Sequence, residues 1–178
     1  AIKAAETGHL LMSTLHTPDA QSTILRIMAM FAPEEQDIIR VRLAEALHAV
    51  ISQRLLPKRT GKGRAVAAEI MINTPAIKDL ILEGTRIGEI RDFIEEVRDQ
   101  YGMQSFDQCL ADLVGRGEVT FEVAKAAASN PSDFELKMRM FSQISDTTEV
   151  AVVEEPQPEP AGASNGLQLG GGLEFLSQ

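Results

Sequence analysis

The sequence has little of what a disulfide-bonded, membrane-spanning or metal-binding protein needs. It contains one cysteine, Cys109, which excludes an intrachain disulfide and is typical of a reducing compartment. No apolar run reaches the roughly 18 residues that a membrane-spanning helix requires. The three histidines are not spaced with one another or with the cysteine as zinc ligands are. We therefore expect no metal site, no direct membrane insertion and a cytoplasmic protein.

A phosphate-binding loop is also missing. Such a loop has the pattern G-x-x-x-x-G-K-[ST], in which backbone N–H groups and a lysine surround the phosphates. The nearest approach is the run Gly61-Lys62-Gly63-Arg64, which lacks both the spacing and the hydroxyl residue. Phosphoryl transfer depends on positioning and on neutralising charge, so we expect this chain alone not to hydrolyse nucleoside triphosphates.

The charge is acidic and unevenly distributed along the chain. There are 17 basic and 26 acidic residues, which gives a net charge of −9. Six of the acidic residues follow Arg139, where no basic residue remains. An acidic balance disfavours broad binding to nucleic acids or to anionic membranes, so we expect no nucleic-acid partner.

The most informative stretch is residues 8–17, which read GHLLMSTLHT. Its middle is apolar and its ends are polar, a pattern that predicts a strand buried on both faces of a parallel sheet. Polar residues at the carboxyl end of such a strand face ligands, and here they are His16 and Thr17. Thr17 and Pro18 together predict an N-cap and a first helical residue, for a helix over residues 19–30.

These residues resemble the histidine box of the type II/IV secretion ATPase superfamily, most closely that of the type IV pilus retraction (twitching motility) ATPases. The match is specific because two histidines, His9 and His16, lie in intact Gly-His-Leu and Thr-Leu-His-Thr frames. Further matches follow in the family's order, and the resemblance covers residues 1–141. The other matching segments are residues 52–57, 63–71, 74–77 and 101–108.

The resemblance implies that His9 and His16 are both needed for motor activity, as catalytic residues. Without it, a histidine beside a buried strand is more often a hydrogen-bonded core residue. His16 or Thr17 would sense a γ-phosphate or orient water, while His9 would hold the shape of the loop. Arg54 and Arg64 would face a phosphate or a neighbouring subunit, with surface ion pairs as the alternative. The implied cofactors are ATP and Mg²⁺, in the intact protein.

One helix departs from the family pattern. Residues 76–83 read AIKDLILE, where the family has an AIRNLIRE helix associated with pilus retraction. Lysine is not equivalent to arginine in bidentate contacts, and Leu82 cannot replace a charged residue. The resemblance therefore extends to the wider family more firmly than to retraction itself.

We expect an α/β fold, namely the C-terminal part of a RecA-like motor core followed by a helical lobe and a disordered tail. The core, residues 1–73, would hold a mostly parallel sheet with helices, and a hairpin of strands at 51–56 and 65–72. The lobe would span residues 74–141. The tail, residues 142–178, is rich in Glu, Pro, Ser and Gly, a composition that cannot bury a core.

Local signals place several helix ends. Thr74 and Asn130 are each followed by proline, as N-caps often are, and Ser105 with Gln108 predicts a capping box. Gly8 would end a helix over residues 1–7.

The turn between the two predicted strands is basic. A solvated turn is the simpler explanation, and a role between subunits or beside a nucleotide is the alternative. The residues concerned are Lys58, Arg59, Lys62 and Arg64.

The resemblance implies a portion of a hexameric ATPase motor that couples ATP binding and hydrolysis to type IV pilus retraction or a related secretion process. The intact protein would be an ATP hydrolase, cytoplasmic and peripheral to the inner membrane, acting on an inner-membrane pilus assembly platform. In that family the phosphate loop and an acidic, magnesium-binding segment precede the histidine box, so we interpret the chain as a C-terminal part. The alternative is a non-catalytic assembly or regulatory module derived from such a motor.

Overall fold

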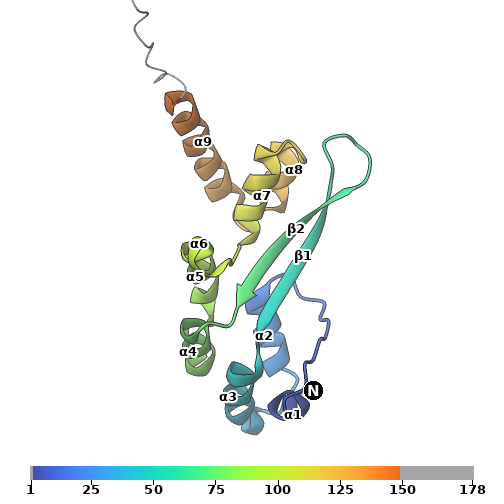
Figure 1. The fold of residues 1–178 in the computed structure, drawn as a ribbon, viewed down its shortest axis with the longest axis vertical. Coiled ribbons are helices and arrows are strands. Elements are labelled where there is room, and N and C mark those ends of the chain that lie inside the picture. The colour runs from blue at the N-terminus through green and yellow to red at the C-terminus, as the bar shows by residue number, and fades with distance from the viewer. Residues whose placement is uncertain (1, 149–178) are drawn as a thin grey trace, which may run out of the picture.

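The computed structural model describes the backbone of residues 2–148 and the side chains of residues 2–140. Its fold is of the predicted α/β class, with helices packed along an antiparallel β-hairpin (Figure 1). The first half of the chain forms α1 (Ile2–Glu6), α2 (Ala20–Met28), the 3-10 turn η1 (Pro33–Glu35), α3 (Gln36–Ala46), β1 (Ala49–Pro57) and β2 (Arg64–Ile72). The second half forms α4 (Pro75–Glu83), the 3-10 turn η2 (Ile87–Glu89), α5 (Ile90–Glu96), α6 (Arg98–Tyr101), α7 (Phe106–Gly115), α8 (Phe121–Ala127) and α9 (Pro131–Thr148).

The hairpin confirms the two strands that the sequence predicts. β1 and β2 pair antiparallel from Ala49 opposite Ile72 to Pro57 opposite Arg64. Burial alternates along both strands, as expected when one face of a sheet is covered and the other is open. The outer edge of β2 carries a single further bridge, between Ile70 and Gln104.

The covered face of the hairpin contributes to two apolar clusters. One cluster lies at the end of the hairpin near α3 and contains Val50 and Met71 with buried residues of α2, α3, α4 and α5. The other lies toward the turn and contains Leu56 and Ala67 with buried residues of α7, α8 and α9. The predicted boundary between residues 73 and 74 falls inside the first cluster, and it stays a prediction.

Three of the predicted N-caps, at Thr74, Ser105 and Asn130, are confirmed. The side chain of Thr74 accepts a hydrogen bond from the backbone of Ile77 at 3.4 Å. Ser105 and Gln108 form the reciprocal capping box, with bonds of 3.2 Å and 3.0 Å. The side chain of Asn130 accepts from two backbone N–H groups at the start of α9, at 3.2 Å and 3.4 Å. Local sequence is sufficient here because each cap is made within a few residues.

The strand predicted within residues 8–17 is wrong. Residues 9–17 have no regular secondary structure, and Leu10 and Met12 are 86% and 92% exposed. A strand that is buried on both faces needs neighbours that pair with its edges, and the described residues supply none. For the same reason they contain no parallel strand pair.

The predicted N-cap of the following helix is also wrong. Asp19, and not Thr17, caps α2, since its side chain accepts a hydrogen bond from the backbone of Ser22 at 2.7 Å. Pro18 therefore lies before the cap and not at the first helical position.

At the other end of the chain, α9 continues to Thr148, so the first residues of the predicted tail are helical. The rest of that predicted tail, residues 149–178, lies outside the described residues. In the part of the chain that the structure covers, no helix combines the length and the apolar character needed to cross a membrane.

Candidate functional site

The segment that carries His16 runs beside β1 and α2. Residues 11 and 13–17 line a hollow of about 640 Å³, together with Thr23 and Ile27 of α2 and residues 49–53 of β1. His16 is exposed and Thr17 is half-buried. The structure therefore brings these two predicted site residues together on one accessible hollow.

The hydroxyl of Thr17 has a defined hydrogen-bonding role. It lies 2.7 Å from the hydroxyl of Thr23, which itself donates to the carbonyl oxygen of Asp19 at 2.8 Å. A hydroxyl has one proton to donate, so Thr17 must be the donor to Thr23. The lone pairs of Thr17 remain available to accept a hydrogen bond from water or another donor.

His9 lies apart from this hollow, at the end of α1. Its Nδ1 is 3.0 Å from the hydroxyl of Thr7 and 3.2 Å from the carbonyl oxygen of Ala4. This carbonyl oxygen already accepts hydrogen bonds from the backbone N–H groups of Thr7 and His9 and from the Thr7 hydroxyl, so the His9 ring lies against a turn that is hydrogen-bonded without it. The polar contacts of the ring thus lie within residues 4–9, and the role of His9 in holding the loop stays a prediction.

Arg54 points from β1 into a different hollow. One guanidinium nitrogen donates to the carbonyl oxygen of Ala127 at 2.8 Å and another donates to that of Pro18 at 3.3 Å. The guanidinium carbon lies 3.9 Å from the centre of the Phe106 ring, within range of a cation–π interaction. Arg54 thus makes internal contacts on three sides.

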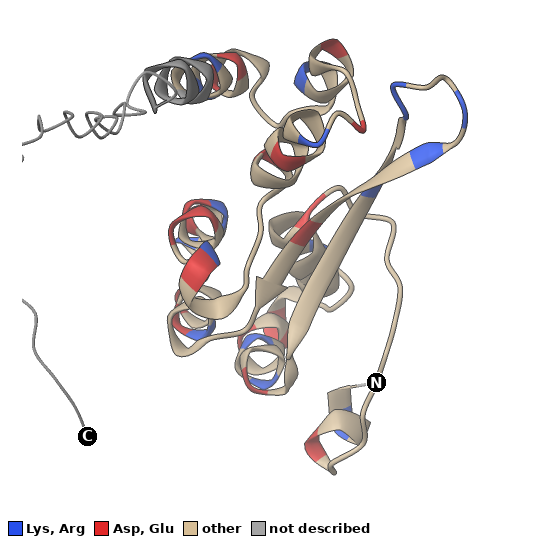
Figure 2. Cartoon of the chain, turned by 45° about the horizontal axis from the view of Figure 1, so that its top comes forward, with Lys and Arg blue, Asp and Glu red and all other residues tan. Residues whose placement is uncertain are grey.

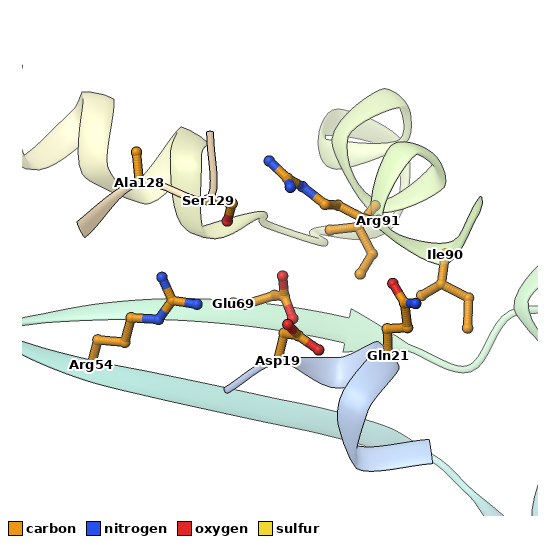
Figure 3. Close-up of a pocket in the computed structure, with 9 residues that line it drawn as sticks. Asp19, Gln21, Arg54, Glu69, Ile90, Arg91, Ala128 and Ser129 are labelled. Atoms are coloured by element: carbon orange, nitrogen blue, oxygen red, sulfur yellow. The ribbon is translucent and has the colours of Figure 1, made fainter. Parts of the chain in front are cut away.

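This second hollow has a volume of about 390 Å³ and lies between the hairpin, α2, α5 and the connection from α8 to α9 (Figure 3). Of its polar lining the prediction named Arg54 but not Glu69, although Glu69 occupies an inward position in the alternating pattern of β2. Figure 3 shows Arg54 and Glu69 projecting from the hairpin, with Asp19 beside them and Arg91 and Ser129 across the hollow.

Glu69 is a buried carboxyl group, only 4% exposed. Its Oε1 accepts a hydrogen bond from the backbone N–H of Ala20 at 2.7 Å. Burial raises the pKa of Glu69, and the charge of Asp19 adds to this effect. The hydrogen bond and the charges of Arg54 and Arg91 act in the opposite direction.

Asp107 holds the opposite wall of the same region. It is 5% exposed, and one of its carboxylate oxygens accepts from Arg91 at 2.7 Å while the other accepts from the backbone of Ser129 at 2.9 Å. Its sequence signals are its place in the capped first turn of α7 and in the matching segment 101–108, and neither predicts that its side chain is buried.

Arg64 is the first residue of β2 and follows the turn of the hairpin. Figure 2 shows Lys and Arg gathered at this tip of the hairpin. Within the described part of the chain, no ion pair is formed by the four basic residues of the turn. The backbone N–H of Arg59 donates to the carbonyl oxygen of Glu118 at 2.8 Å, which joins the tip to the turn between α7 and α8.

No group of three or more His, Cys, Asp or Glu side chains among the described residues is arranged to hold a metal ion. The chemistry that these residues offer is therefore that of an exposed imidazole, a hydroxyl with free lone pairs and several guanidinium groups. Such groups suit an anionic or hydrated ligand.

Comparison with known sequences identifies a family and several relatives. The sequence profile of the family described as "Type II/IV secretion system protein" matches residues 1–130. The "Type IV pilus retractation ATPase PilT" of Pseudomonas aeruginosa is 44% identical over 134 residues, which are 75% of this chain and 38% of that protein. The "Type IV pilus ATPase PilU" of the same organism is 35% identical over 167 residues, which are 91% of this chain and 43% of PilU.

Solved structures give the same picture. The pilus retraction motor PilT with bound ADP superposes with a TM-score of 0.65 at 38% identity, over 75% of this chain and 36% of that one. The ATPase DotB of Legionella pneumophila superposes with a TM-score of 0.59 at 25% identity, over 70% of this chain and 33% of that one. The chain thus spans about two-fifths of the length of the curated relatives above, 38% of PilT and 43% of PilU.

Proposed function

Because this chain belongs to the type II/IV secretion system protein family, we propose that it forms part of an ATP-driven motor for type IV pilus retraction or a related secretion process. The proposal rests on the family match over residues 1–130, which include His9 and His16, on the 44% identity with the retraction ATPase, and on the hollow onto which His16 and Thr17 open. The motor would be a hexamer that acts on an inner-membrane pilus assembly platform, from the cytoplasm and peripheral to that membrane.

In this proposal His16 and Thr17 face the nucleotide. An exposed imidazole can orient a water molecule or donate to a terminal phosphate. Thr17, whose proton is committed to Thr23, would accept a hydrogen bond from such a water molecule. His9 would keep the connection from α1 in shape, and so act without touching the nucleotide.

ATP and Mg²⁺ supply the phosphoryl chemistry of such a motor. The described residues include no carboxylate cluster for the ion, so we assign the ion and most phosphate contacts to other parts of the intact motor. Arg64, exposed and without an ion pair in the described region, is available to a phosphate or a neighbouring subunit. Arg54 would act on the nucleotide indirectly, through the backbone of Pro18.

A chimera tests this function. The segment of Pseudomonas aeruginosa PilT that matches this chain would be replaced by the corresponding residues of this chain, and ATP hydrolysis would be measured. We expect hydrolysis, with a loss of at least about tenfold in the His16→Ala variant because positioned proton donors and acceptors contribute such factors. His48→Ala is the matched control, since His48 is exposed and lies outside the histidine segment.

Two outcomes of the chimera experiment would contradict parts of this proposal. A chimera that folds and assembles but does not hydrolyse ATP would contradict the motor assignment and support the alternative, a non-catalytic assembly or regulatory module. Equal activity of the His16→Ala and His48→Ala variants would keep the motor but remove His16 from its site.

A further inference from the structure

Two connections that are far apart in the sequence meet at one side chain. The guanidinium group of Arg54 donates to the carbonyl oxygen of Pro18, directly after the histidine segment, and to that of Ala127, the last residue of α8. We infer that Arg54 is a positioning residue that couples the histidine segment to the C-terminal helices α7–α9. It would pass a displacement of either part to the other.

Arg54 is fixed in the position that this role requires. It lies on the covered face of β1, between the inward positions of Ser52 and Leu56. The ring of Phe106, itself 1% exposed, lies 3.9 Å from its guanidinium carbon. Packing of this kind restricts the rotamers of a long side chain. Arg54 is therefore a rigid link between the two connections that it contacts.

Each connection has a second, independent anchor. Glu69 accepts from the backbone of Ala20 at 2.7 Å, next to the Pro18 contact. Asp107 accepts from the backbone of Ser129 at 2.9 Å, next to the Ala127 contact. Among the hydrogen bonds of the described residues, those of Arg54 are the ones that reach both connections, so the other two anchors cannot replace it.

The chemistry of the side chain explains why arginine is needed. Two carbonyl oxygens on different elements must be reached at once, and a guanidinium group offers several N–H donors in a fixed planar fork. A lysine has one mobile ammonium group, and a glutamine has a shorter side chain. Neither can hold both carbonyl oxygens in this geometry.

The coupling can be measured by hydrogen exchange in the full 178-residue chain. The perturbation is Asp107→Asn, which weakens the anchor of the α8–α9 connection from the lobe side. With Arg54 present, we expect it to speed amide exchange in the first turn of α2, residues 20–24, by about threefold or more, because coupling between sites is reciprocal. In the Arg54→Gln background the same change should have no effect on α2.

Controls separate coupling from loss of structure. Exchange of amides within β1 and β2 reports that each variant is folded. Arg26→Gln is the matched control, since Arg26 is an exposed arginine on α2 without an ion pair among the described residues, and it should preserve the response. Arg54→Lys should lose it as Arg54→Gln does. An equal response of α2 in the presence and absence of Arg54 would overturn the inference.

A second hydrogen-exchange experiment tests the coupling in the chimeric motor. This part of the inference rests on the proposed function, whereas the exchange measurement above needs no nucleotide. In the active chimera, addition of ADP should alter exchange both in residues 9–17 and in residues 127–134, counted in the present numbering. Arg54→Gln should abolish only the second change. Loss of both changes would overturn the coupling role and place Arg54 at the nucleotide itself.

Discussion

Arg40 on α3 lies directly over Gly84, at the end of α4. A methyl group built on Gly84 would be 1.3 Å from Nη1 of Arg40 and 2.4 Å from its Cζ. Gly84 also has a φ of +71°, a backbone conformation that residues other than glycine rarely adopt. The contact seats α3 on the last turn of α4 without an intervening side chain.

Gly84→Ala should therefore destabilise the chain by about 1–3 kcal/mol, the range for strained backbone at a residue with a Cβ. Urea unfolding followed by circular dichroism would measure this loss. The same substitution in an Arg40→Ala background should cost less, because the guanidinium group no longer has to move. An equal cost in both backgrounds would assign the whole effect to the backbone.

Asn73 should be required for the junction between α3 and the hairpin. Its side-chain amide donates to the carbonyl oxygens of Ala44 and Leu47, at 2.9 Å and 2.8 Å, at the end of α3. Asn73→Ala leaves both carbonyl groups without this donor and should cost about 1–3 kcal/mol.

Asn73→Asp should cost more than Asn73→Ala, because a carboxylate cannot donate and is repelled by the negative end of α3. Thermal unfolding would rank the variants, with Gln100→Ala as the control for loss of an exposed amide. A more stable aspartate variant would contradict the donor role.

Glu69 should make the stability of the fold depend on pH. Its pKa is raised by burial, so the folded state binds its proton more tightly than the unfolded state does. Its contribution is fully present below the usual carboxyl pKa and is lost as the pH rises through the raised value.

Glu69→Gln should therefore gain stability relative to the natural chain as the pH rises from about 4 to 7. The glutamine oxygen can still accept the hydrogen bond from Ala20. Denaturant midpoints at several pH values would show this, with Glu34→Gln, an exposed residue, as the control. A difference that does not change with pH would refute the assignment.

Substitution of Met12 should have different effects on the 178-residue chain and on the chimeric motor. It is 92% exposed here, so Met12→Asp should change the stability of the 178-residue chain by less than about 0.5 kcal/mol. In the chimera the same substitution should abolish folding or ATP hydrolysis, because we expect this apolar segment to be buried there. A fully active Met12→Asp chimera would show that the segment stays exposed.

Most local features of the fold were predictable, apart from the N-cap of α2, which is Asp19 and not Thr17, whereas features that need distant partners were not. The caps at Thr74 and Ser105 and the hairpin depend on residues close in sequence. The segment at residues 10–15 has the composition of a buried strand, but a strand also needs edges to pair with, and composition cannot show whether these are present.

The candidate site divides in the same way. The motif singled out His16 and Thr17, which are adjacent in the sequence, and the structure places both on the hollow beside β1. The motif did not reveal that Arg54 contacts Pro18 and Ala127, since these contacts depend on how α8 and the segment before α2 pack against β1. The buried carboxyl groups of Glu69 and Asp107 were missed for the same reason.

The hairpin has a mechanical consequence. Its strands have nine residues each, a length of about 30 Å, and their two ends belong to different apolar clusters. A paired strand resists stretching because its backbone is already extended, but the twist of a β-ribbon varies over a wide range. The hairpin can therefore twist about its long axis: a rotation of about 10° between its ends would move a point about 10 Å from that axis by about 2 Å. Rearrangement of α3 and α4 would in this way reorient α7 and α8 without breaking a hydrogen bond of the ladder.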